Sequence, residues 1–422
     1  MRHATGFIAL AAALIGLAWA EPVRGGTAPR PEAPAIVAAR APDADRVPAP
    51  TVEPVRAATA GPDRDGRAAP TAGPADGIGA ERVASAAGRA SAVGSERAAP
   101  APVVLHVAST FPGAMALVGQ GGLRLAGKVA RATGGELLLT FHEPGQLAPA
   151  ADAVKAVARG DIDAAWAGAG WFADEDSAFN MFSSVPFGPG IGEYMGWMYN
   201  GGGLALAREM FHARGIHNLP CAVIPPEASG WFRREITSLN ELRGLRMRFF
   251  GLGAKVMEKL GVTTQQIPPG EILQALKAGT LDATEFSLPL MDKPFGFDQV
   301  AKYYYFPGWH QQATFFDLYI AKAAWDRLSD RHRAVVELAC GDLIRETIAE
   351  GEAAQGAVLK EMQARGVQLK RWPPEILVAL DETWDEVVEE EMTRNPNFRR
   401  VYGSYARFRS TYAVWRHLGY LQ

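Results

Sequence analysis

The chain has 422 residues, and its 43 Lys and Arg residues against 46 Asp and Glu residues give a formal net charge of −3. Binding to nucleic-acid phosphates requires a strongly basic surface, so we expect no nucleic-acid partner. Between residues 21 and 100 more than half of the chain is Ala, Pro or Gly, and there is no Phe, Trp or Tyr. Such a segment cannot bury enough apolar surface to offset the entropy of ordering it, so we expect the folded part to begin near residue 101.

Residues 1–20 have the pattern of a secretory signal peptide. A short positively charged start precedes an apolar run, and the residues from Ala18 to Ala20 fit a small-residue cleavage site. The run is shorter than the roughly 20 apolar residues of a membrane-spanning helix. We therefore expect export to the periplasm with cleavage after Ala20, followed by a disordered linker rich in Ala, Pro and Gly over residues 21–102.

The next block, residues 103–225, alternates predicted strands and helices. Short apolar runs favour buried strands, and apolar residues spaced three or four apart favour helices. In chain order we expect a strand over 103–108, a helix over 119–133, a strand over 137–141, a helix over 150–159 and a strand over 162–167. This alternation is typical of a parallel sheet covered by helices on both faces, and we interpret the block as the first lobe.

Residues 226–320 repeat the alternation and are interpreted as the second lobe. Ser238 and Glu241 have the spacing of a helix capping box. The expected elements are strands over 245–250, 263–267 and 281–286, with helices over 251–260 and 269–278. Ligands of open α/β sheets bind beyond the carboxyl ends of the strands, which directs attention to Arg248, Glu285 and Phe286.

Residues 321–422 are predicted to form a helical region. Helices are expected from Ser329 to Gly366, from about Pro374 onward, and over 397–418. Helices of this length can brace the two lobes or form the contact of a homodimer, and the sequence leaves both possibilities open.

The two cysteines, Cys221 and Cys340, do not form a pair with zinc-ligand spacing. Cys340 lies in an apolar helical stretch, where we expect a buried thiol. An oxidising compartment leaves a bond between the two as the alternative. The chain contains no GxSxG, P-loop or HExxH motif, so the sequence does not favour an enzyme.

Three segments carry a resemblance to a known family. They are GWFRREITSLNELRGLRMRFFGLGAKVMEKLG from Gly230, PPGEILQALKAGTLDATEF from Pro268 and GFDQVAKYYYFPGWHQ from Gly296. The sequence resembles the substrate-binding subunits of tripartite ATP-independent periplasmic (TRAP) transporters, in particular the branch that binds 2-oxo and hydroxy acids. The resemblance implies an α/β, two-lobed fold like that of type II periplasmic binding proteins, with additional long C-terminal helices.

The same resemblance implies a receptor rather than an enzyme. It would capture a small organic carboxylate, such as a 2-oxo or 2-hydroxy acid, close around it, and deliver it to membrane permease subunits. Three alternatives remain. A ligand sensor that serves a membrane signalling receptor would share the fold and the pocket, and a periplasmic enzyme would use Glu285 as a base near a metal. The third is a two-lobed receptor of an ATP-driven transporter, against which the segments around Arg248 and Glu285 argue.

In that family, an Arg at the place of Arg248 fixes the ligand carboxylate. A guanidinium can bind a carboxylate through two parallel hydrogen bonds, and the N-terminus of the helix that follows adds a favourable potential for an anion. Arg246 lies two residues earlier on the same strand and is expected to point the same way, so it is a rival for this role.

The resemblance also implies a bound cation. Glu285 and Phe286 match a Glu-Trp pair whose Glu side chain and following backbone carbonyl hold a cation that touches the ligand. Glu227 and Gln311 fall where relatives carry further ligands, and Glu227 and Glu285 would also contact the substrate. Oxygen ligands of this kind suit Na⁺, Ca²⁺ or Mg²⁺, so we expect Na⁺ or Ca²⁺ there. A solvated loop carboxylate is the alternative for Glu227.

Five further side chains are candidates for the wall around the ligand: Trp171, Phe172, Phe187, Trp309 and His310. Aromatic residues in α/β folds more often belong to the core, and that interpretation stays open for the first four. His310 could donate a hydrogen bond to the ligand or simply pack.

Overall fold

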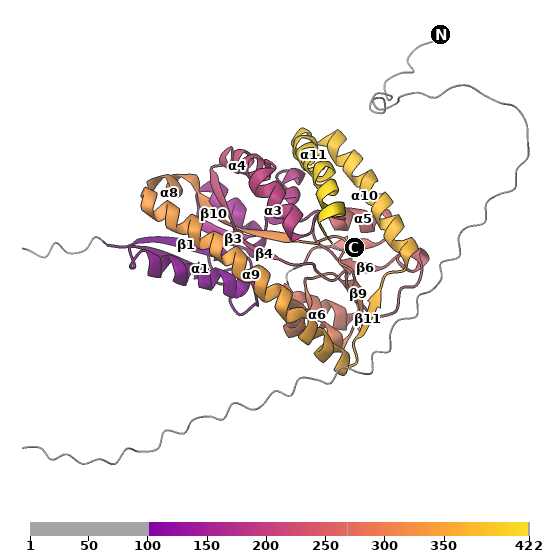
Figure 1. Ribbon diagram of the computed structural model, residues 1–422. Helices are drawn as coiled ribbons and strands as arrows, with labels where there is room; N and C mark the ends of the chain where they lie inside the picture. Colours follow the sequence, from indigo (N-terminus) through magenta and orange to yellow (C-terminus); the bar gives the residue numbers. More distant parts are fainter. Residues whose placement is uncertain (1–100, 268, 421–422) are drawn as a thin grey trace, which may run out of the picture. The chain divides into compact units, whose positions relative to one another are not determined.

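The computed structural model of the protein describes residues 101–267 and 269–420, in which helices flank two β-sheets (Figure 1). The predicted signal peptide, residues 1–20, and nearly all of the predicted linker, 21–102, lie outside the described residues. Within the described part, none of the helices combines the length and apolar character needed to cross a membrane.

The first sheet is built from five strands. They are β1 (Val103–Ser109), β2 (Leu137–His142), β3 (Ala164–Ala167), β4 (Ile216–Ile224) and β10 (Thr314–Ala321). Their spatial order is β2-β1-β3-β10-β4, in which β1 is parallel to β2 and β3. β10 is antiparallel to both β3 and β4. The three predicted strands β1, β2 and β3 are parallel, as the alternation predicts. The sheet as a whole is mixed, because β10 returns from far along the chain and enters in the opposite direction.

Helices cover both faces of this sheet, as the alternation predicts. One face packs against α1 (Val118–Ala132) and α9 (Asp330–Ala364). The other packs against α2 (Ala153–Arg159), α3 (Ile191–Asn200) and α4 (Gly203–His212). Short 3-10 turns precede α2 and follow β3, namely η1 (Ala150–Asp152), η2 (Ala169–Phe172) and η3 (Ser177–Phe182).

The second sheet has six short strands. They are β5 (Gly230–Phe232), β6 (Arg246–Arg248), β7 (Thr263–Gln265), β8 (Ala283–Thr284), β9 (Tyr303–Phe306) and β11 (Gln368–Arg371). Their order is β11-β9-β5-β8-β6-β7, and β6 is parallel to both β7 and β8. β5 runs antiparallel to β8 and β9, so this sheet is also mixed.

Two helices of this part agree with the sequence pattern: α5 (Leu252–Lys259) and α6 (Pro269–Ala278). The short turn η4 (Leu239–Glu241) also follows its predicted cap, whereas the sequence pattern does not predict the four-residue helix α7 (Pro289–Asp292) or the turns η5 (Lys293–Phe295) and η6 (Phe297–Gln299). The capping box of Ser238 and Glu241 is present at the start of η4.

Three parts of the chain connect the sheets: the segment between β4 and β5, the segment between β9 and β10, and α9 with β11. Residues 226–320, interpreted from the sequence as the second lobe, do not all belong to the second sheet, because β10 at the end of this range belongs to the first sheet. After α8 (Lys322–Arg327), the Ser329 hydroxyl caps α9 by accepting a hydrogen bond from the His332 N–H. α9 then contacts β4 in the first sheet and α7 beside the second.

The last two helices pack onto both halves of the fold (Figure 1). α10 (Pro374–Arg394) contacts α5, whereas α11 (Pro396–Gly419) contacts α3 and η3. The starts of both helices and the end of α11 lie within a few residues of the bounds that the 3.6-residue spacing of apolar residues predicts.

Cys221 and Cys340 form a disulfide bond, so the expectation of a buried thiol at Cys340 is wrong. The bond joins β4 to α9 across their packed interface, and both side chains are buried. A spacing of 119 residues hides this contact in the sequence, because only the folded chain brings β4 and α9 together.

Candidate functional site

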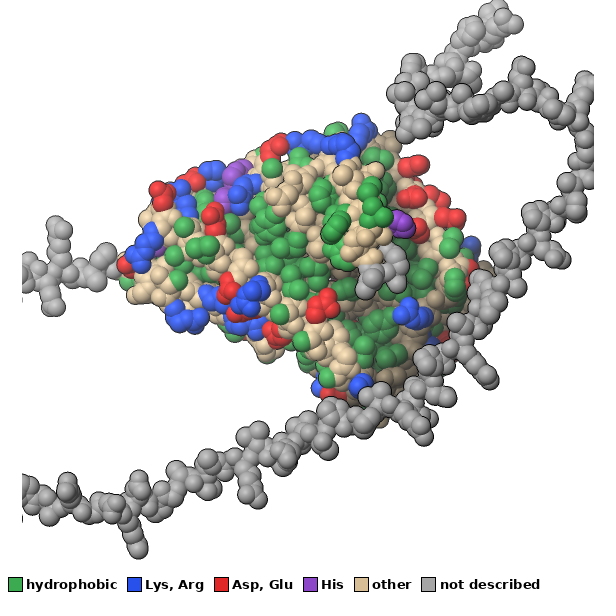
Figure 2. All heavy atoms as spheres, in the orientation of Figure 1, with side chains coloured by type: hydrophobic (Ala, Val, Ile, Leu, Met, Phe, Trp, Pro, Cys, Tyr) green, Lys and Arg blue, Asp and Glu red, His purple; other side chains and the backbone are tan. Residues whose placement is uncertain are grey.

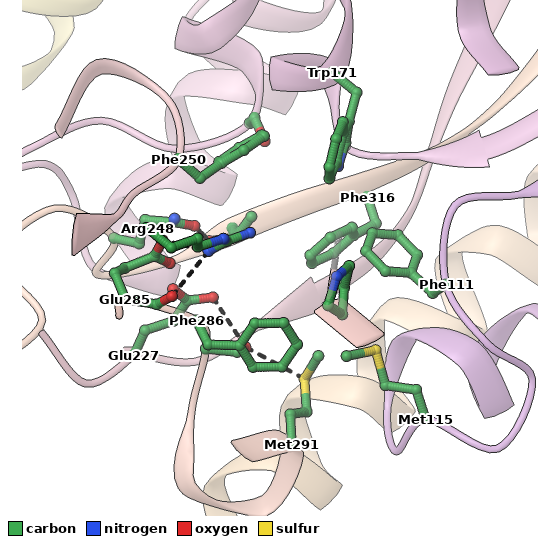
Figure 3. Close-up of a pocket in the computed structure, with 16 residues that line it drawn as sticks. Phe111, Met115, Trp171, Glu227, Arg248, Phe250, Glu285, Phe286, Met291 and Phe316 are labelled. Atoms are coloured by element: carbon green, nitrogen blue, oxygen red, sulfur yellow. Dashed lines mark hydrogen bonds and ion pairs between the residues drawn. The ribbon is translucent and has the colours of Figure 1, made fainter. Parts of the chain in front are cut away.

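A cavity lies between the two sheets, with polar side chains on one side and apolar side chains on the other (Figure 3). It encloses about 520 Å³ of empty space, part of which is open to solvent. The residues that line it are Phe111, Met115, Gly168, Trp171, Ser183, Glu227, Arg248, Phe250, Pro269, Glu285, Phe286, Ser287, Met291, Gln311, Thr314 and Phe316.

Arg248 and Glu285 come together because β6 and β8 are parallel neighbours. Arg248 ends β6 and pairs in register with Thr284, so Glu285 follows at the same carboxyl edge. The Arg248 Nη1 donates to Glu285 Oε2 at 2.6 Å and to the Glu285 carbonyl at 3.0 Å. Arg248 is only 4% exposed, and its Nε has no hydrogen-bond partner among the described residues. A buried guanidinium with a free N–H at a cavity can donate to an anion.

Arg246 has different surroundings, although it lies on the same strand. Its side chain is 47% exposed and does not line the cavity. Its guanidinium forms an ion pair with Asp282, in which Nη2 and Oδ1 are 2.8 Å apart. The two arginines of β6 therefore separate into one that faces solvent and one that faces the cavity.

Glu227 and Gln311 are brought together by the two segments that connect the sheets. The Glu227 N–H donates to the Gln311 carbonyl at 3.1 Å, and the Gly308 N–H donates to the Glu227 carbonyl at 3.0 Å. A Cβ at Gly308 would lie 2.2 Å from that carbonyl oxygen, so only glycine permits this close approach. The Gln311 Oε1 accepts a hydrogen bond from the Thr314 hydroxyl at 2.8 Å.

His310 lies between the two buried carboxylates. Its Nε2 is 3.5 Å from Glu227 Oε2 and 3.5 Å from Glu285 Oε1. Burial raises the pKa of Glu227 to about 7, with a further contribution from the Glu285 charge that the contact with His310 opposes. Burial alone would lower the pKa of His310, but the two carboxylates raise it to about 9. His310 and Arg248 therefore balance the charges of the two buried carboxylates.

This arrangement fits a cation. One ligand atom each from Glu227, Glu285 and His310 lies within 4.8 Å of the others. Glu227 Oε2 and Glu285 Oε1 are buried and have no hydrogen-bond partner among the described residues. Gln311 and Phe286 line the same cavity. Carboxylate and carbonyl oxygens are ligands that Ca²⁺ and Na⁺ prefer, so the residues present suit a hard cation.

The candidate wall residues fall into two groups. Trp171 lines the cavity, where its ring lies 5.2 Å from that of Phe250. Phe172, Phe187 and Trp309 do not line it. Phe172 is buried in the core, and the rings of Phe187 and Trp309 stack on each other at 5.6 Å. The Trp309 ring is also 5.6 Å from the ring of His310. The Phe187–Trp309 pair therefore packs against His310 and does not form part of the cavity wall.

Several lining residues could not be identified from the sequence motifs. Phe111 and Phe250 follow the carboxyl ends of β1 and β6, so the rule that pointed to Arg248 could have found them. Met115 and Phe316 carry no local signal. Ser183 also lines the cavity, and its buried hydroxyl has no hydrogen-bond partner among the described residues.

Comparison with known proteins identifies the family. The family model described as bacterial extracellular solute-binding protein, family 7, matches residues 109–395. The chain belongs to this family. A curated relative from Nostoc sp., a monocarboxylate 2-oxoacid-binding periplasmic protein, is 30% identical over 297 residues, covering 70% of this chain and 82% of the relative.

Solved structures agree with this assignment. A TRAP transporter solute-binding protein from Bordetella bronchiseptica is 30% identical, with a TM-score of 0.73, and the match covers 75% of this chain and 94% of that chain. It is a mixed-occupancy dimer, with copurified calcium and picolinate in one active site and an apo site. A TRAP periplasmic solute-binding protein from Colwellia psychrerythraea with bound calcium and pyruvate is 25% identical, with a TM-score of 0.72, over 75% and 97% of the two chains.

The present chain is therefore a two-lobed α/β solute receptor of the TRAP type, and not an enzyme. It belongs to a class of extracytoplasmic proteins that work with a membrane permease. The expected family, fold class and receptor function are confirmed, and the comparisons do not favour a signalling receptor as the partner.

Proposed function

We propose that this receptor binds a 2-oxo or 2-hydroxy monocarboxylate and that Arg248 holds the ligand carboxylate. The observation that carries the proposal is the buried Arg248 guanidinium: the residue lines the cavity, and its Nε has no hydrogen-bond partner among the described residues. The Nostoc relative, named for monocarboxylate 2-oxoacids, and the Colwellia structure with pyruvate support this ligand class. Ser183, on the first-sheet side of the cavity, offers an unpartnered hydroxyl to the same ligand.

A cation completes the proposed site. Glu227 and Glu285 would hold it through the carboxylate oxygens that face His310, together with the Phe286 carbonyl and the Gln311 amide. When bound, the cation would offset the two carboxylates and attract the oxygens of the ligand. Calcium in the Bordetella and Colwellia structures supports Ca²⁺, and the neutral amide and carbonyl oxygens also suit Na⁺.

A thermal-shift screen tests both parts of this proposal. The protein is heated with pyruvate, lactate and acetate, each in the presence of chelator, NaCl or CaCl₂. A ligand at 1,000 times its Kd stabilises the folded state by about 4 kcal/mol, which corresponds to a rise of several degrees in Tm. We expect pyruvate to raise the Tm only when a cation is present. If no carboxylate changes the Tm under any condition, the proposal is wrong.

The two halves of the fold would close around the ligand as a hinge. Glu227 lies on the segment between β4 and β5, and Gln311 lies on the segment between β9 and β10. A ligand and cation bound in the cavity would therefore contact the two segments that connect the sheets. We expect the radius of gyration from small-angle X-ray scattering to fall when ligand and cation are added. An unchanged radius in the presence of saturating ligand would contradict closure.

Export with cleavage after Ala20 remains part of the proposal. Its support is the sequence pattern of residues 1–20 and the periplasmic location in the name of the Nostoc relative. Intact-mass spectrometry of the protein from a bacterial periplasmic extract should give a mature chain that begins at Glu21.

Homodimer formation through the C-terminal helices is also proposed. Figure 2 shows apolar side chains gathered between α3 and α9 and over the end of α11. Leu338 is 74% exposed, Leu418 is 76% exposed, and Trp415 is also exposed. Light scattering should give twice the protomer mass, and Trp415→Glu should reduce it. Leu123→Glu, a change of an exposed residue on α1, should leave the mass unchanged; a monomeric wild-type protein would contradict the proposal.

A further inference from the structure

The cavity has two chemically different ends (Figure 3). Arg248, Glu285 and Glu227 lie at one end, where the proposed function places the ligand carboxylate and the cation. Phe111, Phe316 and the two methionines lie at the opposite end. A small acid such as pyruvate is accounted for by the first end alone, so the second end requires its own explanation.

The second end is built almost entirely from apolar side chains. Phe111, Met115, Phe316 and Met291 are each buried, and the rings of Phe111 and Phe316 pack edge to face at 5.3 Å. The Phe286 ring continues this surface toward the polar end, where the Arg248 guanidinium lies 5.6 Å from its centroid. Such a surface gains free energy by covering apolar ligand atoms and offers no hydrogen bonds.

The polar groups near this end do not suit a second ligand charge. Among the lining residues of the described part, Arg248 is the only Lys or Arg. The Ser287 hydroxyl already donates to Glu227 Oε1 at 3.1 Å, which leaves the neutral Ser183 hydroxyl as the unpartnered group on the first-sheet side. A second carboxylate there would be buried without a counter-charge, which is strongly unfavourable.

We propose, on the basis of the proposed function, that the ligand is a 2-oxo acid with a bulky apolar side chain and no second charge, of the branched-chain or aryl type. Its carboxylate binds Arg248, and its side chain occupies the surface formed by Phe111, Met115, Met291 and Phe316.

The positions of these residues give the side chain a second role. Phe111, Met115 and Phe316 belong to the part of the fold around the first sheet, whereas Arg248 belongs to the second sheet. A long apolar ligand therefore contacts both halves at once, and its affinity includes contacts that form when the halves close. A three-carbon acid held at Arg248 has no side chain to reach the first-sheet wall.

Isothermal titration calorimetry of the exported chain in saturating CaCl₂ tests the inference. The probes are pyruvate, 4-methyl-2-oxopentanoate, phenylpyruvate and 2-oxoglutarate. Each buried methylene contributes about 0.8 kcal/mol, or roughly a fourfold change in Kd. The three added carbons of 4-methyl-2-oxopentanoate should therefore lower Kd at least tenfold relative to pyruvate. 2-Oxoglutarate should bind more weakly than pyruvate.

The outcomes separate this inference from the proposed function. If pyruvate or 2-oxoglutarate binds as tightly as the two apolar acids or more tightly, the inference is overturned and the receptor for 2-oxo acids stands. If none of the four acids binds, both fail. Tighter binding of the two apolar acids supports both.

Variants of similar size locate the side-chain surface. Met115→Gln keeps the length of the side chain and makes it polar, so it should raise the Kd of 4-methyl-2-oxopentanoate at least fivefold and change that of pyruvate less than twofold. Met291→Gln provides the same test from the second half if the first variant folds poorly. Met392→Gln, a half-buried change on α10, is the matched control and should alter neither Kd. An unchanged ratio of the two Kd values in both cavity variants would overturn the assignment of this surface.

Discussion

Replacing Arg248 by Ala should abolish most ligand binding. The guanidinium is buried at the cavity, and its Nε is free to donate. Two charge-assisted hydrogen bonds to a carboxylate contribute about 1.5–3 kcal/mol each, so their loss removes about 3–6 kcal/mol. Because each 1.4 kcal/mol corresponds to a tenfold change, Kd should rise by about a hundredfold to ten-thousandfold. Calorimetry with 4-methyl-2-oxopentanoate and CaCl₂ measures this change.

Arg246→Ala is the control that the structure provides. The two arginines lie on the same three-residue strand, but Arg246 faces solvent and pairs with Asp282. An exposed ion pair contributes at most about 1 kcal/mol to stability, and Kd should stay within twofold of wild type.

Arg248→Ala also leaves the Glu285 carboxylate buried without its partner, and breaking a buried pair costs about 3–5 kcal/mol of stability. Arg248→Lys keeps the charge and should be the more stable variant, while its single point charge cannot form the paired bonds of a guanidinium. Circular dichroism melting establishes that each variant is folded before titration. A folded Arg248→Ala protein with a Kd within threefold of wild type would refute the assignment of Arg248.

Three further changes test other parts of the structure. Replacing Cys221 and Cys340 by Ala should lower the free energy of unfolding by up to about 5 kcal/mol in urea titrations, because the bond closes a loop of 119 residues; an unchanged midpoint would contradict this. Burial raises the pKa of Asp317 to about 7, so the folded state binds a proton more readily than the unfolded chain, whose Asp pKa is about 3.9. The free energy of unfolding should therefore fall as pH rises from about 4 to 7, by up to about 4 kcal/mol, and Asp317→Asn should remove most of that fall in urea titrations at successive pH values. Glu227→Gln should weaken Ca²⁺ more than Na⁺ in cation titrations with pyruvate, because Ca²⁺ affinity follows the number of charged ligands; equal effects would argue against Glu227 as a ligand.

The part of the site that the sequence predicts best lies at strand ends. Arg248 ends β6 and Glu285 directly follows its parallel neighbour β8, so the rule that ligands bind beyond the carboxyl ends of strands points to both. The same local logic predicts the Ser238 capping box and the start of α9 at Ser329. In each case the signal lies within a few residues, so the folded chain is not needed to detect it.

Contacts between distant segments could not be predicted in this way. β10 joins the first sheet although five strands of the second sheet precede it in the chain, and the disulfide joins β4 to α9. Phe187 and Trp309 were reasonable wall candidates, but they stack on each other behind His310. An aromatic residue carries the same signal in a core and in a cavity wall, and only the packing of the segments decides between them.

A crystal structure grown with 4-methyl-2-oxopentanoate and CaCl₂ tests the central claim most directly. The account predicts the ligand carboxylate within hydrogen-bond distance of Arg248, a cation bound by Glu227 and Glu285, and the ligand side chain against Phe111 and Phe316. A ligand whose carboxylate contacts neither Arg248 nor the cation would contradict it.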